Sequence, residues 1–148
     1  LLSLPVKISS GLAVNGLSIV RNLDLFASRF VGVPFSRHDN DCLRFVCRWL
    51  QHNGLPELRD RYDMSYRHHR DFAPCLERSG LTCVAQGFDD LGYNRTDKPR
   101  RGDFMQLTAD EDTMAFGIFD GEYALTISQK EGLCVASPEF IYAWRLPA

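Results

Sequence analysis

One segment in the first third of the chain constrains the fold more than any other. Residues 41–54 read DCLRFVCRWLQHNG, and their apolar side chains recur at the i, i+3, i+4, i+7 and i+8 spacing of a single helix face: Cys42, Phe45, Val46, Trp49 and Leu50. Asp41 is a good N-cap, because its carboxylate can accept from the free N–H groups of the first turn, and Gly54 is a good stop. A helix with one wide apolar face needs a partner surface, so this segment predicts the central helix of a folded domain.

Further helices are expected on either side of this one. Residues 22–30 place Leu23, Phe26, Ala27 and Phe30 on one face, which predicts a short helix before the central one. A third helix is expected over 66–79, interrupted or restarted at Pro74. Residues 81–86, LTCVAQ, indicate a strand or a short extended segment, and the stretch that follows is interpreted as loop.

The last third of the chain has the pattern of strands. Asp120-Gly121 is a strong hairpin turn between two apolar runs. Residues 138–146 fit either a short helix or a final strand. The other strands are expected over 103–108, 114–119, 122–127 and 132–137. Helices first and antiparallel strands after predict an α+β domain, with N-terminal helices packed on a C-terminal sheet.

The chain divides into an arm, residues 1–20, and a domain, residues 21–148. The arm has no helical period, so it is interpreted as an extended segment or a loose hairpin turning near Asn15-Gly16. Either it packs on its own domain as a terminal strand or it docks on another subunit. No apolar run is long enough for a membrane span, and Pro5 and Lys7 interrupt the start, so neither a span nor a signal peptide is expected.

Charge and cysteine content exclude several classes of function. The net charge of −2 argues against a nucleic-acid partner, whose binding surface needs a basic surplus. The chain has five cysteines, an odd number, with no CxxC pair, which favours reduced thiols over a disulfide framework. The four histidines do not have zinc-ligand spacing, so we expect no metal and no cofactor.

Cys42 is the residue that points to chemistry. It lies in the first turn of the central helix, where the partial positive charge of the helix start favours a thiolate. A catalytic nucleophile needs that placement. The alternative is a buried structural cysteine, since cysteine is among the residues most often found in protein cores.

The sequence around Cys42 resembles the NlpC/P60 (papain-like) superfamily of cysteine peptidases. In that family a helix leads to a Gly-x-Pro-Tyr turn and then to Asp-Cys at the start of the main helix. Here Gly32-Val33-Pro34-Phe35 corresponds to the turn, with Phe35 in place of tyrosine, and Asp41-Cys42 to the nucleophile site. The resemblance implies a papain-like fold with Cys42 as candidate nucleophile.

Two later motifs extend the resemblance, and one of them lacks the catalytic base. Gly102-Asp103 resembles the family strand that opens the sheet, and residues 115–121 resemble the strand that normally carries the catalytic histidine. Ala115 occupies the position of that histidine. The third polar residue of the family would fall near Thr126.

A narrower group of phage-encoded relatives is similar over about residues 22–146. It shares Pro34-Phe35, Asp41-Cys42, Gly102-Asp103, Gly117-Ile118 and Ala143-Trp144-Arg145. The resemblance implies a tail-tip or baseplate component of a tailed phage, made in the host cytoplasm and located in the virion. It also implies that other tail-tip or hub proteins are partners, reached through residues 1–20.

The two main hypotheses differ in whether a catalytic base is available to deprotonate Cys42. His38 lies four residues before Cys42 and is a weak candidate base, whereas His52 is ten residues along the helix, about 15 Å away, and is excluded. His68 and His69 are better explained as a solvated basic face. We expect a mainly structural protein with a degenerate peptidase site. The alternative is an active murein endopeptidase or amidase that uses Cys42 on peptidoglycan peptide; an acyl-transfer or small-molecule enzyme on the same fold is a third hypothesis.

Overall fold

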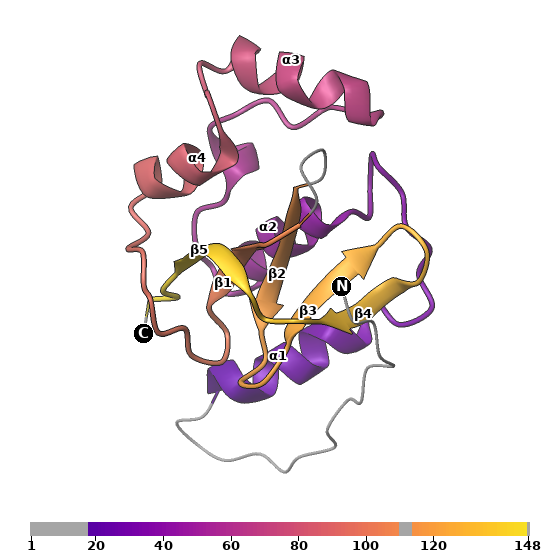
Figure 1. Ribbon diagram of the computed structural model, residues 1–148, viewed down its shortest axis with the longest axis vertical. Helices are drawn as coiled ribbons and strands as arrows, with labels where there is room; N and C mark the ends of the chain where they lie inside the picture. The colour runs from indigo at the N-terminus through magenta and orange to yellow at the C-terminus, as the bar shows by residue number, and fades with distance from the viewer. Residues whose placement is uncertain (1–17, 110–113, 148) are drawn as a thin grey trace.

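The computed structural model describes residues 18–109 and 114–147, and in this part of the chain the helices precede the strands (Figure 1). The α+β prediction is therefore confirmed. The helices are α1 Ser18–Ser28, α2 Cys42–His52, α3 Phe72–Arg78 and α4 Val84–Asp90, with two short 3₁₀ helices, η1 Leu58–Asp60 and η2 His69–Asp71. The strands are β1 Phe104–Leu107, β2 Ala115–Phe119, β3 Ala124–Ser128, β4 Gly132–Ala136 and β5 Phe140–Trp144.

The central helix forms where its periodicity predicts it. The Asp41 carboxylate caps α2 by accepting from the backbone N–H of Arg44 at 2.8 Å. Other boundaries differ from the prediction. α1 begins at Ser18, so residues 18–20 belong to a helix and not to the predicted arm, whose residues 1–17 lie outside the described chain. α3 is confined to seven residues, preceded by the 3₁₀ helix η2.

The prediction of a strand or short extended segment over residues 81–86 is wrong for its second half: Cys83 is extended, but α4 begins at Val84 and takes the last three residues. Val84, Ala85 and Phe88 are buried on one side of this helix, at a spacing that a short window makes hard to distinguish from an extended apolar run. For residues 138–146, where the sequence left a helix or a strand open, the structure has the strand β5.

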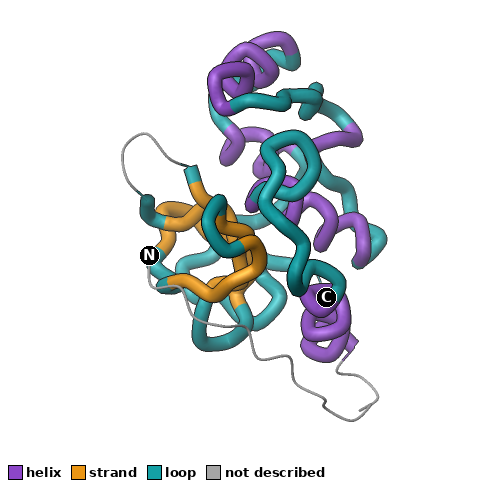
Figure 2. The backbone as a smooth tube through the Cα atoms, turned by 90° about the vertical axis from the view of Figure 1, so that its right-hand side faces the viewer, coloured by secondary structure: helices purple, strands orange, loops and turns teal. Residues whose placement is uncertain are grey.

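The five strands form one antiparallel sheet in the order β4-β3-β2-β1-β5. The strands β4 and β5 lie at opposite edges, yet only residues 137–139 connect them. Four residue steps span at most about 14 Å, whereas the edges of a flat five-stranded sheet are about 19 Å apart. The sheet is therefore rolled, and Figure 2 shows the strands curling around one another.

Rolling gives the sheet two different faces. Phe116 and Ile118 of β2 pack in the main core together with the apolar side chains of α2, which lies behind the sheet in Figure 1. The other face forms a second cluster of mostly small or unbranched side chains: Met105, Leu107, Ala115, Ala124 and Ala143. The three alanines on this inner face allow the strands to curl without overcrowding.

Gly117 is a position where the two strands β2 and β3 leave no room for a side chain. A Cβ atom at Gly117 would lie 2.8 Å from the carbonyl oxygen of Leu125. We expect Gly117→Ala to lower the free energy of unfolding by about 1–3 kcal/mol, measured by urea denaturation, because backbone must move. Gly87→Ala is the control: its Cβ meets the flexible ends of Leu58 and Leu81, and alanine favours the helix, so a smaller loss is expected. Equal losses would contradict this explanation.

Candidate functional site

The Cys42 sulfur contacts the backbone at the start of β2. It accepts a hydrogen bond from the N–H of Phe116 at 3.4 Å, and the thiol points to the carbonyl of Met114 at 3.9 Å. In the ladder between β2 and β3, only Ile118 and Phe119 of β2 are paired with residues of β3. The sulfur therefore binds a backbone group of β2 upstream of the ladder, and it joins the helix start to the sheet.

Thr126 binds the same residue of β2 from the next strand. It is buried, and its Oγ1 donates to the carbonyl of Phe116 at 2.7 Å. Cys42 and Thr126 thus satisfy the N–H and the C=O of Phe116 respectively. The structure brings these two sequence-predicted site residues together around one residue of β2, Phe116.

The pKa of the Cys42 thiol is raised to about 11, mainly by burial and secondly by the negative charge of Asp41. The Phe116 N–H and the Arg37 guanidinium offset part of this rise. The shift is opposite to the one expected from a position at a helix start. The same carboxylate that caps α2 opposes ionisation of its neighbour, so the thiol stays protonated at neutral pH.

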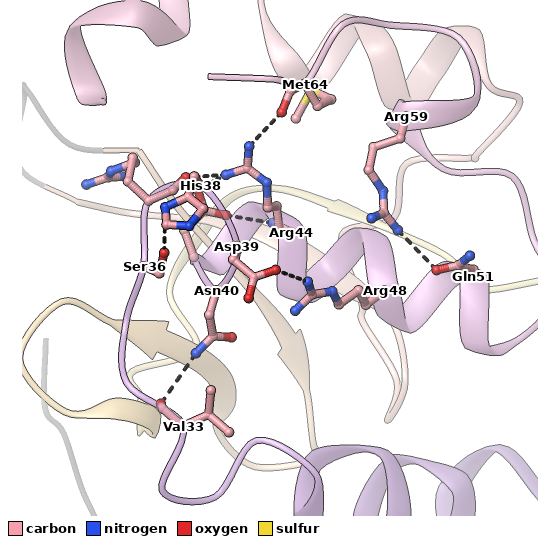
Figure 3. Close-up of polar contacts among 12 residues, drawn as sticks. Val33, Ser36, His38, Asp39, Asn40, Arg44, Arg48, Gln51, Arg59 and Met64 are labelled. Carbon is pink, nitrogen blue, oxygen red and sulfur yellow. Dashed lines mark hydrogen bonds and ion pairs between the residues drawn. The ribbon is translucent and has the colours of Figure 1, made fainter. Parts of the chain in front are cut away.

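A buried polar network surrounds the cap of α2. Asp41 and Arg44 are both buried, and the Arg44 Nη1 and Asp41 Oδ2 atoms are 3.2 Å apart. The Tyr66 hydroxyl donates to the Asp41 carboxylate at 2.5 Å. Arg44 also donates to the carbonyl of Met64 at 2.6 Å (Figure 3). A second bond runs from Arg44 to the carbonyl of Tyr66 at 2.9 Å. The guanidinium lies 4.0 Å from the centre of the Tyr66 ring, and burial together with the Asp41 charge raises the pKa of that phenol.

Sequence reasoning did not single out Arg44 or Tyr66. One signal was present: Arg44 follows the cap residue at i+3, a spacing at which opposite charges can pair on a helix. Tyr66 gave no such signal, because it lies 25 residues from Asp41, at the start of a segment that was predicted as a helix. The network ties the loop before α3 to the start of α2.

The space beside the sulfur is small. A pocket of about 30 Å³ opens there, enough for roughly one water molecule. The described side chains that line it are Arg37, Asp41, Cys42, Leu43, Tyr66, Phe72, Met114 and Phe116. None of these is a histidine.

The histidines proposed or excluded as bases lie as follows. His38 is exposed and is not among the residues lining the pocket; its Nδ1 is hydrogen-bonded to Ser36 Oγ at 2.9 Å (Figure 3). His52 ends α2 and stacks on Trp49. His68 is exposed, and the side chain of His69 lies outside the described ones. The structure therefore does not place His38, the weak candidate base, on the thiol.

Ala115 lies between the two residues whose backbone contacts the Cys42 sulfur, but its side chain lies on the other face of the sheet. Its neighbours Met114 and Phe116 provide the two backbone groups that contact Cys42. The methyl group of Ala115 belongs to the inner cluster of the rolled sheet, with Leu107 and Ala124. A side chain at this position enters that cluster, whereas Phe116 faces the main core.

We expect Ala115→His to lower the free energy of unfolding by about 1–3 kcal/mol and to create no hydrolytic activity. The reason is that an imidazole is larger than the methyl group that the inner cluster accommodates at this position. Thermal unfolding and a peptide hydrolysis assay check the two parts, with Ala115→Val as an apolar control for bulk. Hydrolysis by the histidine variant alone would contradict the assignment of this side chain to the inner cluster.

The Gly-Asp motif has a structural role in this chain. The Asp103 carboxylate is buried and accepts from the backbone N–H groups of Arg100 at 2.8 Å and Leu146 at 2.7 Å. The Gly102 carbonyl accepts from the indole N–H of Trp49 at 2.8 Å. The motif thus joins α2, the first strand and the chain after the last strand.

The comparisons with known proteins place the chain in a family. The family model described as "Domain of unknown function (DUF6950)" matches residues 20–146. The chain belongs to this family. The DUF6950 match includes Cys42, Thr126 and the buried network around Asp41. A search of curated proteins finds no match to the chain.

Two further features of the described part of this DUF6950 chain concern metal binding and membrane insertion. Within residues 18–109 and 114–147, no group of three or more His, Cys, Asp or Glu side chains is placed to hold a metal ion. No helix in the same ranges is long and apolar enough to cross a bilayer. The five cysteines are all free thiols.

Proposed function

We propose that this domain is a non-hydrolytic relative of the NlpC/P60 peptidases that serves as a structural component of a phage tail tip or baseplate. One observation carries the first half of this proposal. The Cys42 sulfur is bonded to the backbone of β2, and the described side chains around it include no imidazole.

A cysteine hydrolase needs a base within hydrogen-bond reach of its thiol, oriented by a third group. General-base assistance is typically worth about 10²–10⁴-fold in rate. Here the groups that meet the sulfur are backbone atoms of Met114 and Phe116. They stabilise a thiol in place, which suits a sulfur that joins two elements better than one that attacks a carbonyl.

The arrangement of elements supports the kinship with NlpC/P60 proteins. Helices come first, an antiparallel sheet follows, and the cysteine lies at the start of the helix that packs on β2. The tail-tip assignment is supported by the ordered motifs that the chain shares with phage-encoded relatives, from Pro34-Phe35 to Ala143-Trp144-Arg145.

A hydrolysis assay on murein peptides tests the chemical half. We expect the full chain to release no more product than a Cys42→Ala variant or a buffer control. The alternative, an active murein endopeptidase or amidase, is favoured by the partly exposed position of Cys42 at a helix start. Cleavage by the wild-type chain that Cys42→Ala abolishes would establish this alternative and contradict the proposal.

Mass spectrometry of purified phage particles tests the location. We expect the chain among the virion proteins, in amounts comparable to other tail-tip components. A chain found only in lysates of infected cells, and absent from washed particles, would contradict a structural role in the tail.

A further inference from the structure

β5 forms one edge of the sheet, and the described chain covers this edge at one end only. Arg95 bridges Trp144, and the backbone N–H of Thr96 donates to the carbonyl of Ala143 at 2.9 Å. In the described ranges, no strand or bridge lies on the outer edge of the preceding residues, Phe140–Tyr142. The sheet therefore has room for an additional strand at that point.

A groove runs along this uncovered edge. Its volume is about 470 Å³, and it is lined by Arg95, Thr96, Asp97, Phe140, Ile141, Tyr142 and Ala143. The side chain of Ile141 projects into solvent with 52% of its surface exposed. Proteins usually protect sheet edges with charges, prolines or a covering segment, because an open edge pairs readily with other chains. The Arg95 guanidinium lies 4.2 Å from the centre of the Tyr142 ring and protects that part of the edge, whereas the exposed Ile141 offers an apolar contact to a covering segment.

The first residues of the chain have the sequence of such a segment. Residues 2–8, LSLPVKI, alternate apolar side chains at Leu2, Leu4, Val6 and Ile8 with polar residues or proline, which is the period of a strand. Pro5 has no N–H to donate, so a strand that contains it cannot form a complete hydrogen-bond ladder on one of its two sides. Such a strand is typically found at the edge of a sheet. Lys7 complements the charge of Asp97 in the groove wall.

We propose that residues 2–8 of a neighbouring copy add a strand to the outer edge of β5, with their apolar side chains against Ile141. The choice of a second copy rests on the proposed function, since a tail component assembles with its neighbours. Residues 9–17 contain Gly11 and Gly16 and can span up to about 30 Å, long enough to reach an adjacent domain. Such a head-to-tail contact links copies into a ring or chain.

Two substitutions in the chain of residues 1–148 test the contact from both sides. Ile141→Asp blocks the edge and leaves the segment intact, whereas Leu4→Asp blocks the segment and leaves the edge intact. We expect light scattering to show that wild-type mass rises with concentration and that each variant alone is a monomer. An equimolar mixture of the two variants should form a dimer, because one copy supplies the segment and the other the edge. Leu25→Asp, at an α1 site that is 57% exposed, is the matched control and should assemble like wild type.

Hydrogen–deuterium exchange supplies the outcomes that overturn the proposal. In the assembled wild type, the amides of residues 2–8 should exchange at least about tenfold more slowly than in a free peptide of that sequence. Exchange at the free-peptide rate, or a mixture of variants that stays monomeric, contradicts the contact. Protection that persists in a dilute monomer assigns the segment to its own domain and contradicts the role of a second copy. None of these results depends on Cys42, so the hydrolysis assay can fail or succeed separately.

Discussion

Arg44→Met is expected to lower the free energy of unfolding by about 3–5 kcal/mol. The substitution keeps the length of the side chain but removes the positive charge from a site where only 5% of the residue is exposed. It leaves the buried Asp41 carboxylate without its ion pair, and it removes the donors to the carbonyls of Met64 and Tyr66. Urea denaturation monitored by Trp fluorescence measures the loss.

Arg48→Met is the matched control on the same helix. Arg48 pairs with Asp39 at 2.8 Å, but the Asp39 side chain is 67% exposed, and such surface pairs contribute about 0–1 kcal/mol. A double variant, Arg44→Met with Asp41→Asn, should recover part of the loss because it removes the stranded charge. Equal losses at positions 44 and 48 would show that the Asp41–Arg44 pair is not the anchor of this region.

Alkylation of Cys42 by iodoacetamide is expected to be at least about a hundredfold slower than alkylation of Cys83 at neutral pH. A pKa of about 11, against an ordinary value of 9.0, leaves about a hundredfold less of the reactive thiolate. Cys83 is exposed and serves as the internal control. Peptide mass spectrometry after timed quenching gives both rates from one sample.

The pH profile of that reaction separates a protonated thiol from an activated one. The rate at Cys42 should rise about tenfold per pH unit through the neutral range, because the thiolate fraction does so below the pKa. A rate that is fast and constant near pH 7, or one that falls in a His38→Ala variant, would indicate a thiolate paired with an imidazole and contradict the structural interpretation.

The fold was predictable where the sequence has long, regular patterns. The apolar stripe of α2 and its Asp41 cap predicted both the helix and its start, and Asp120-Gly121 predicted the hairpin of β2 and β3. α4 was missed because seven residues give a periodicity too short to separate helix from strand. The rolling of the sheet was also missed, since it follows from the short link between β4 and β5 and from the strand order, which local sequence does not reveal.

The candidate site was predictable in its position but not in its electrostatics. The placement of Cys42 at the first turn of α2, and its approach to the strand that begins at Ala115, agree with the sequence. The direction of its pKa shift does not, because the helix-start argument considers one effect and omits burial and the Asp41 charge. The contribution of Tyr66 depends on a contact across 25 residues, which no local pattern indicates.

The central claim is that Cys42 is a protonated thiol that joins α2 to β2. Carbon-13 NMR of the full chain labelled at cysteine Cβ tests it most directly, because the Cβ resonance of Cys42, assigned with Cys42→Ser, moves when its own thiol ionises. We expect this resonance to stay constant through neutral pH and to titrate with a midpoint of about 11. A midpoint near or below neutrality, coupled to the titration of a histidine, would contradict the account.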